Sequence, residues 1–430
     1  MNTFRHGIHP KAQKFFAADR SIRIMPPPAT VYIPVAQHLG KPAVPLVNPG
    51  DCVRRGQKIA AAAGAVSADI FASVSGCVKA VEDRATLTGK CRHIVIENDY
   101  KYDTVSFAAL DNPSRQDILS RVADCGIVGM GGAGFPTVVK LDHKTSVDTF
   151  IINGAECEPY LTCDYRVMLE KVDEFLDGAL LLAEATGVRH ATIALEANKK
   201  DAADLISAKI ASGKLNAEVV VVKTKYPQGA EKQLIYAVSG RKVPPGKLPA
   251  SVGCIVSNVQ TAYAAHLAVR KGQPLYERCM TVSGDGIAEP ANLNVAVGTL
   301  YSDVIEFCGG AKDDTVKLIS GGPMMGITAA SADISVTKTT SGLLLMTAES
   351  AFVGAPGPCI NCAKCAKACP MRLMPMYIDG CILHGDVQGA IKYGAKNCIE
   401  CGCCAYVCPA KRPLVQSIRL AKKKIKEAGK

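Results

Sequence analysis

The sequence predicts a multidomain α/β plus β chain that ends in a small, helical, cysteine-rich module. Three observations predict this fold class: short strand-like segments between turns in residues 29–100, alternating strands and helices in residues 111–272, and a doubled cysteine pattern in residues 353–430. A chain of 430 residues has room for roughly two to four domains.

Composition narrows the class of protein. Hydrophobic residues make up 48% of the chain, enough for ordinary cores, whereas aromatic residues make up 5% and tryptophan is absent. So few aromatic side chains argue against stacking platforms for nucleic acid. The formal charge is +11, and much of it lies in a C-terminal run of lysines. That run is either a solvated tail or a surface for an acidic partner or an anionic bilayer.

Residues 1–20 show no secretory signal, because they are polar and lack an apolar core. No run of about 18 apolar residues occurs, so we expect no segment that spans a bilayer. The nineteen cysteines are an odd number, which favours a reducing compartment over a disulfide framework.

An N-terminal arm, residues 1–28, precedes the first β region, residues 29–100. Expected here are strands at 31–35, 70–74 and 77–81 and turns at 48–51 and 56–57. The stretches 49–57 and 72–76 resemble the biotinyl/lipoyl barrel-sandwich hybrid. That fold carries a modified lysine on the hairpin between them, but residues 64–68 hold none. We therefore expect a structural or docking domain.

Residues 111–272 predict an α/β layer with a mainly parallel sheet. Gly126 ends a first helix around 118–123. Further helices are expected at 167–184, 202–210, 231–238 and 261–269, and strands at 150–152, 191–195 and 217–222.

Residues 275–330 return to strands, at 280–283, 293–297 and 317–320, with a short helix at 300–307. This order resembles a ubiquitin-like β-grasp module of the SLBB type. We expect it to stand between the α/β layer and the cysteine-rich module.

Residues 353–430 contain the pattern Cys-x2-Cys-x2-Cys-x3-Cys-Pro twice, 39 residues apart. Ferredoxins with two [4Fe–4S] clusters have this spacing, and the fourth cysteine of each run ligates the other cluster. Zinc is a poor alternative, because it favours two Cys-x2-Cys pairs around one ion. We expect one cluster on Cys359, Cys362, Cys365 and Cys408, and the other on Cys398, Cys401, Cys404 and Cys369, with Cys403 outside the register.

A glycine-rich segment at 129–134 matches Gly-x-Gly-x-x-Gly, which alone is weak evidence. A dinucleotide-binding βαβ unit needs a strand before the segment and a helix within it, but here a helix precedes it and Phe135-Pro136 follows. A flexible linker is the plain alternative. Glycines also let the backbone approach a flat ring and a phosphate closely.

The continuation of this segment decides between the alternatives. Residues 129–140 read Gly-x-Gly-Gly-Ala-Gly-Phe-Pro-Thr-x-x-Lys, which resembles the flavin- and NADH-binding subunit of respiratory complex I. Segments 153–159, 229–231 and 256–261 resemble later segments of that family, in the same order. Ala155 and Ala230 stand where that family has acids, which leaves the detailed contacts open.

The resemblance implies roles for these side chains. Lys140 would pair with the flavin phosphate or ribityl oxygens, and Phe135 would lie against a ring. Asparagine and serine side chains would supply hydrogen bonds, and Glu156 and Glu231 would order the dinucleotide. Lys242 and Lys247 are either surface lysines or phosphate contacts. The expected cofactor-binding residues are Gly129, Gly131, Gly132, Gly134, Phe135, Lys140, Asn153, Glu156, Gly229, Glu231, Val256, Ser257 and Asn258.

Over essentially the whole chain, the order of segments is similar to that of the RnfC family, the C subunits of Rnf electron-transport complexes. Residues 7–10 and 33–38 open this order, and residues 321–326 precede the cysteine runs. The resemblance implies non-covalent FMN, NADH as substrate and two [4Fe–4S] clusters, with no catalytic Ser, Cys or His constellation. It also implies a peripheral place on the cytoplasmic face of a membrane complex that couples ferredoxin and NAD to Na⁺ or H⁺ transport. The implied partners are membrane and ferredoxin-accepting subunits, and no nucleic acid.

Two other interpretations remain open from the sequence. One is a soluble flavin and iron–sulfur reductase of the same build, such as a cobalamin reductase or the electron donor of an amino-acid reductase. The other is a non-enzymatic iron–sulfur relay that has lost its flavin.

The segment 417–430 predicts a helix with one apolar face. Ile418, Ala421 and Ile425 have helical spacing, and the remainder is basic. We expect this helix to attach the chain to membrane subunits or anionic lipid, with the barrel-sandwich domain as a second contact.

Overall fold

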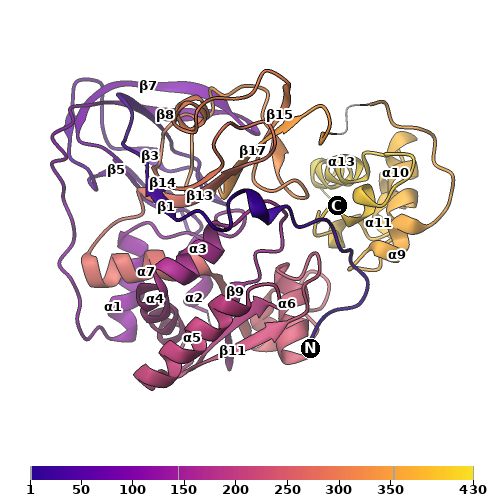
Figure 1. Cartoon of the computed structure of the whole chain (residues 1–430), viewed down its shortest axis with the longest axis horizontal. Helices are drawn as coiled ribbons and strands as arrows, with labels where there is room; N and C mark the ends of the chain where they lie inside the picture. The colour runs from indigo at the N-terminus through magenta and orange to yellow at the C-terminus, as the bar shows by residue number, and fades with distance from the viewer. Residues whose placement is uncertain (1, 144, 352–353, 430) are drawn as a thin grey trace.

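The computed structural model describes residues 2–143, 145–351 and 354–429. Residues 353 and 430, the predicted ends of the cysteine-rich module, lie outside this part of the chain. Figure 1 shows the β-rich regions above the α/β layer and the short helices of the cysteine-rich module at one end of the molecule. None of the described helices is long and apolar enough to cross a membrane.

Two small antiparallel sheets form the N-terminal β region. One has the order β2 (Thr30–Pro34), β8 (Gly89–Asn98), β7 (Gly76–Thr86) and β4 (Cys52–Val53), and the other β3 (Val44–Pro45), β5 (Lys58–Ala61) and β6 (Ile70–Phe71). Their apolar side chains share one core, in which Ile33, Ile59 and Ile94 are fully buried.

The predicted strand at 31–35 and the turns at 48–51 and 56–57 are confirmed. The strand expected at 70–74 is only two residues long, and the one at 77–81 is part of the much longer β7. β8 has no counterpart among the predicted strands. Its exposed start and run of four buried residues give no regular alternation of polar and apolar side chains.

The α/β layer has a four-stranded parallel sheet of order β11-β10-β9-β12, as its alternation predicts. The strands are β9 (Thr149–Gly154), β10 (Ala191–Glu196), β11 (Ala217–Val222) and β12 (Cys254–Asn258). The helices are α1 (Arg115–Asp124), α2 (Thr137–Leu141), α3 (Cys163–Glu170), α4 (Val172–Ala185), α5 (Lys200–Gly213), α6 (Glu231–Ser239) and α7 (Val259–Lys271).

Local sequence explains both ends of α1. Ser114 and Asp117 form a capping box at the start of α1, and Gly126 follows its end with φ +62. The helix predicted at 167–184 is two helices, because the backbone of Lys171 leaves the helical range at φ −129. α4 crosses α7 closely at Gly178, where a Cβ would lie 1.8 Å from the carbonyl oxygen of Ala262.

The region predicted as a β-grasp module belongs to a mixed six-stranded sheet of order β1-β14-β13-β17-β15-β16. Its elements are β1 (Ile22–Ile24), β13 (Glu277–Ser283), β14 (Ala291–Ala296), α8 (Tyr301–Phe307), β15 (Thr315–Ser320), β16 (Ile327–Thr328) and β17 (Gly342–Thr347). β1 and β17 lie outside the predicted range 275–330. β17 pairs with β13 and β15, and all its residues are buried.

The cysteine-rich module contains α9 (Lys364–Ala368), α10 (Pro375–Leu383), α11 (Val387–Lys392), α12 (Cys403–Tyr406) and α13 (Leu414–Glu427). The apolar face of α13, with Ile418, Ala421 and Ile425, packs against Ile378 and Ile382 of α10. The predicted helix is confirmed, and its apolar face belongs to the module's own core. Its exposed residues include Lys423, Lys426 and the apolar Leu420. The expected attachment of this helix to a membrane complex stays a prediction.

Candidate cofactor and cluster sites

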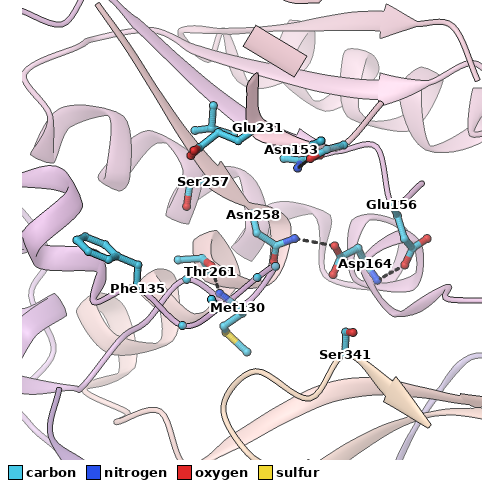
Figure 2. A pocket seen from close by; sticks show the side chains of 18 of the residues that line it. Met130, Phe135, Asn153, Glu156, Asp164, Glu231, Ser257, Asn258, Thr261 and Ser341 are labelled. Atoms are coloured by element: carbon cyan, nitrogen blue, oxygen red, sulfur yellow. Dashed lines mark hydrogen bonds between the residues drawn. The ribbon is translucent and has the colours of Figure 1, made fainter. Parts of the chain in front are cut away.

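A cavity of about 550 Å³ lies at the carboxyl ends of β9 and β12, beside the glycine-rich loop (Figure 2). Ligands of open α/β sheets bind outside the carboxyl ends of the strands. All thirteen residues expected to bind a cofactor line it: Gly129, Gly131, Gly132, Gly134, Phe135, Lys140, Asn153, Glu156, Gly229, Glu231, Val256, Ser257 and Asn258.

The glycine-rich loop, residues 129–134, forms one wall of the cavity. Met130 donates its backbone N–H to Thr261 Oγ1 at 3.0 Å, which holds the loop against the start of α7 (Figure 2). A Cβ on Gly131 would lie 2.8 Å from Asn258 Nδ2, whereas a Cβ on Gly132 would meet open space. The loop therefore presents bare backbone, as close contact with a flat ring requires.

Asn153 and Asn258, at the ends of β9 and β12, are held by neighbouring groups. Asn153 Nδ2 donates to the carbonyl oxygen of Gly229 at 2.8 Å, and Asn258 Nδ2 donates to Asp164 Oδ2 at 2.7 Å. Asn258 Oδ1 accepts from the N–H of Gln260 and caps α7. Both side chains lie at the cavity with several of their hydrogen-bonding groups already used.

Lys140, in α2, and Glu231, at the start of α6, form an ion pair at the cavity wall, with Nζ and Oε1 2.6 Å apart. The side chains are 33% and 39% exposed, so water screens the pair and its contribution to stability is small. Lys140 donates one of three ammonium protons here and keeps two for an anionic oxygen.

Glu156, on the loop after β9, is largely enclosed by protein groups. Its side chain is 4% exposed, and Oε1 accepts from the N–H of Asp164 at 2.7 Å (Figure 2). Burial raises the pKa of this carboxyl to about 7, and the nearby Lys14 and Lys199 oppose the rise. Of the two acids expected to order the dinucleotide, Glu231 is therefore the more exposed.

Glu158 also lines the cavity, although it was not among the predicted site residues. Its carboxylate accepts from the N–H groups of Met324 and Met325 at 3.1 and 3.0 Å and lies 3.1 Å from Tyr226 Oη. Burial raises the pKa of Glu158 to about 7. Tyr226 Oη donates to the carbonyl oxygen of Cys401 at 2.7 Å, so these contacts connect the cavity loop to the second cysteine run.

Other lining residues carried little or no sequence signal. Asp164 and Ser341 belong to no motif, whereas Met325 lies in the segment 321–326 and Ile399 in the second cysteine run. Their position at the cavity depends on contacts between distant parts of the chain. Among the described residues, Lys232 lines the cavity but Lys242 and Lys247 do not.

Two small cavities in the cysteine-rich module bring the predicted ligands together. Each cavity draws three cysteines from one run and one from the other, which is the donor set that a [4Fe–4S] cluster takes in two-cluster ferredoxins. The first is lined by Cys359, Cys362, Cys365 and Cys408, and the second by Cys369, Cys398, Cys401 and Cys404. Cys403 also borders the second cavity, with its Sγ 3.9 Å from the carbonyl oxygen of Tyr226.

The second cysteine cavity adjoins the cofactor cavity. Ile399, between Cys398 and Cys401, lines both of them. The first cysteine cavity shares no lining residue with the cofactor cavity among the described residues. The second set of cysteines is therefore the one that adjoins the cofactor cavity.

Family models match successive parts of the chain. They are the RnfC barrel sandwich hybrid domain at residues 2–101, the Nuo51 FMN-binding domain at 122–267, the SLBB domain at 280–328 and a 4Fe-4S dicluster domain at 353–409.

Curated relatives are similar over nearly the full length. The C subunit of the proton-translocating ferredoxin:NAD⁺ oxidoreductase complex of Clostridium ljungdahlii is 45% identical, over 100% of this chain and 95% of the relative. The C subunit of the Na⁺-translocating complex of Acetobacterium woodii is 43% identical, over 98% and 97%. The C subunit of the ion-translocating oxidoreductase complex of Rhodobacter capsulatus is 42% identical, over 99% and 83%.

Among solved structures, a chain of the NAD⁺-reducing [NiFe]-hydrogenase in its H₂-reduced state is similar with a TM-score of 0.53 and 18% identity. The match covers 74% of this chain and 63% of that chain. At this identity the likeness shows a shared fold alone.

Proposed function

This chain belongs to the RnfC family, the C subunits of ion-translocating ferredoxin:NAD⁺ oxidoreductase complexes, and we propose that its glycine-loop cavity binds FMN and NADH. It is an electron-transfer oxidoreductase subunit with FMN, two [4Fe–4S] clusters and NAD(H) as substrate. Its partners are the other subunits of the complex.

The residues present suit these groups. Bare backbone at Gly132 faces open space, and each cysteine cavity gathers the four thiols of one predicted ligand set. When bound, the flavin exchanges a hydride for single electrons and the clusters carry single electrons.

We assign binding roles on this basis. The loop 129–134 carries the flavin ring, and the two remaining donors of Lys140 bind phosphate or ribityl oxygens. Ser257 and Phe135, on the same side of the cavity as Glu231 in Figure 2, contact the ring system. Asn153 and Asn258 hold the strand ends in place, and Glu231 takes the dinucleotide hydroxyls.

The main support for this proposal is the position of Ile399. It lines both the cofactor cavity and the cavity of Cys369, Cys398, Cys401 and Cys404. A flavin in the first cavity and a cluster in the second are then neighbours. Electron transfer slows steeply with distance, so this adjacency favours one path from NADH through flavin and the second cluster to the first.

The test is an anaerobic NADH titration of the reconstituted chain. Flavin bleaching and the electron paramagnetic resonance of both reduced clusters should appear together, with flavin released on denaturation. A reconstituted chain that holds iron–sulfur clusters but releases no flavin would contradict the proposal. It would support the alternative of a non-enzymatic iron–sulfur relay that has lost its flavin.

We also propose a peripheral position on the cytoplasmic face of the membrane, because NAD(H) is a cytoplasmic substrate. The relatives named as subunits of translocating complexes support attachment through membrane subunits. Membrane fractionation followed by protease treatment of right-side-out and inverted vesicles tests this position. Digestion of the chain only in right-side-out vesicles would contradict a cytoplasmic position.

A further inference from the structure

Residues 2–24 of the N-terminal arm contact several parts of the molecule in turn. Asn2 bridges to Val222 at the end of β11, and Ile8 pairs with Tyr226 through two backbone hydrogen bonds of 2.9 Å. The arm ends in β1, which pairs with β14. Figure 1 shows the arm, in indigo, passing the cysteine-rich module before it reaches the β-rich regions.

The arm also binds the cysteine-rich module directly. Gly7 donates its N–H to the carbonyl oxygen of Ala368 at 3.0 Å, and the buried Ile8 belongs to one apolar cluster with Ala368, Cys401 and Cys403. Gly7 has φ +78, and a Cβ there would lie 2.5 Å from the carbonyl oxygen of Tyr226. The arm is therefore closely fitted at the junction of the two modules.

Lys14 is the point at which the arm meets the cofactor cavity. Its Nζ donates to the carbonyl oxygens of Glu156, Glu158 and Leu161 at 2.9, 3.1 and 2.5 Å. These bonds match the three donors of a lysine ammonium group. Nζ also lies 3.6 Å from Glu156 Oε2.

The loop that Lys14 binds has a costly backbone conformation. Glu156 has φ +42 and Tyr160 has φ +69, and neither is glycine. A left-handed backbone is unfavourable for residues that carry a side chain, and it persists only where the surroundings hold it. Three convergent bonds from Lys14, with a bond from Tyr160 N–H to the arm residue Ala12, provide that restraint.

The same loop carries Glu158, which contacts Tyr226, and Tyr226 in turn donates to the carbonyl oxygen of Cys401. A shift of the loop would therefore alter both the cavity wall and the contact with the second cysteine run.

We propose that Lys14 is a positioning residue for electron transfer: it holds the loop 156–161 so that this loop closes the cofactor cavity and stays in register with Cys401. The proposal rests on the proposed function of the cavity. Nothing in the motifs of the chain marks Lys14 for this role.

A pH signature accompanies this geometry. The charged or titratable groups around Glu156 are Lys14, Lys199, Asp164 and Cys163. Burial raises the pKa of Glu156 to about 7 and Lys14 opposes the rise, so removal of the Lys14 charge should raise this pKa further.

The test compares Lys14→Met and Lys14→Arg with Lys11→Met, which removes an exposed lysine of the same arm. Lys14→Met should weaken FMN affinity by at least about tenfold, slow cluster reduction by NADH, and move the pH midpoint of FMN affinity upward. Lys14→Arg keeps the charge but its planar fork cannot meet three convergent carbonyls, so affinity should fall while the midpoint stays. Lys11→Met should match wild type.

Hydrogen exchange of residues 156–161, measured without flavin, separates this proposal from the proposed function. Faster exchange in Lys14→Met and Lys14→Arg than in Lys11→Met supports the positioning role. This conclusion does not depend on FMN binding. If FMN fails to bind the wild-type chain, only the assignment of the cavity is overturned. Unchanged exchange, or unchanged FMN affinity in both Lys14 variants, would overturn the positioning role. If Lys14→Met does not fold, Lys14→Arg decides.

Discussion

Tyr226 donates its phenolic proton to the carbonyl oxygen of Cys401 at 2.7 Å, although the two residues are 175 positions apart. Tyr226 is 1% exposed and follows β11 of the α/β layer, whereas Cys401 is a predicted ligand of the second cluster. The same hydroxyl lies 3.1 Å from Glu158 Oε1 at the cofactor cavity. One buried hydroxyl thus connects the cavity to the cysteine-rich module.

Tyr226→Phe should destabilise this junction. The change leaves a buried carbonyl oxygen without its donor, at a cost of about 1 to 3 kcal/mol. We expect NADH to bleach the flavin at the wild-type rate but to reduce the clusters more slowly, as stopped-flow absorbance measures. Tyr406→Phe, an exposed tyrosine of the same module, is the control. Equal rates of cluster reduction by NADH in both variants would show that Tyr226 does not affect electron transfer to the clusters.

Cluster ligation predicts an iron count for each cysteine variant. Cys362→Ala and Cys401→Ala should each lose one cluster, which lowers iron from about eight to about four atoms per chain. Cys403→Ala should keep its iron, although Cys403 borders the second cavity. Iron analysis with electron paramagnetic resonance measures both. Loss of a cluster in Cys403→Ala alone would show that the assigned ligand register is wrong.

Gly132→Val should abolish flavin binding. A Cβ at residue 132 meets open space, so the branched side chain would enter the cavity where the flavin is expected. Flavin occupancy and NADH-dependent dye reduction should collapse, while the cluster signals remain. Gly380→Val is the control, because a Cβ there also meets open space but lies in α10 of the cysteine-rich module. Retained NADH activity in Gly132→Val would contradict the cavity assignment.

Lys338 predicts a pH-dependent stability. It is fully buried and donates to the carbonyl oxygens of Asp69 and Gly126, which joins the barrel-sandwich domain to the α/β layer. Burial lowers its pKa from 10.5 to about 7. Between these values the unfolded chain binds more protons at this site than the folded chain does, so the contribution of Lys338 to stability rises with pH.

Lys338→Met should remove this rise and lower the melting temperature, because it also leaves the carbonyl oxygens of Asp69 and Gly126 without their lysine donor. The melting-temperature gap between wild type and variant should widen from about pH 7 to about pH 9. The exposed Lys90→Met is the control. A gap that is constant with pH would mean that Lys338 keeps an ordinary pKa in the folded chain.

Truncation and charge removal should have different effects on α13. Lys422 donates to the carbonyl oxygen of Cys398 at 2.7 Å, and Ile425 is 2% exposed in the module core. Deletion of residues 422–430 should therefore loosen the second cluster site.

The double variant Lys423→Gln with Lys426→Gln changes two exposed positions and should spare the clusters. It should also make membrane retention more salt-sensitive, at about 1 kcal/mol per lysine. Identical salt-release curves for this variant and wild type would show that these lysines are only solvated.

Local patterns in the sequence determined the chemistry of this protein. The doubled cysteine spacing predicted two complete ligand sets, and each set lines one cavity. The alternation of strands and helices predicted the parallel sheet, and the motif residues from Gly129 to Asn258 all reached one cavity. The cysteine and sheet predictions succeed because short-range spacing fixes which side chains leave a loop or strand end together. The cavity residues were instead expected from the resemblance of four separate segments to the flavin-binding subunit of complex I.

The tertiary structure alone decided how these parts are joined. Lys14 meets Glu156 and Tyr226 meets Cys401 across 142 and 175 positions, and no sequence period relates such residues. An apolar face predicts burial but not the surface that buries it. The apolar face of α13 covers α10, and β17 lies in the middle of a sheet of which only β13, β14 and β15 were predicted. Which surfaces meet is decided by the packing of the whole chain, because burial is favourable against any complementary apolar surface.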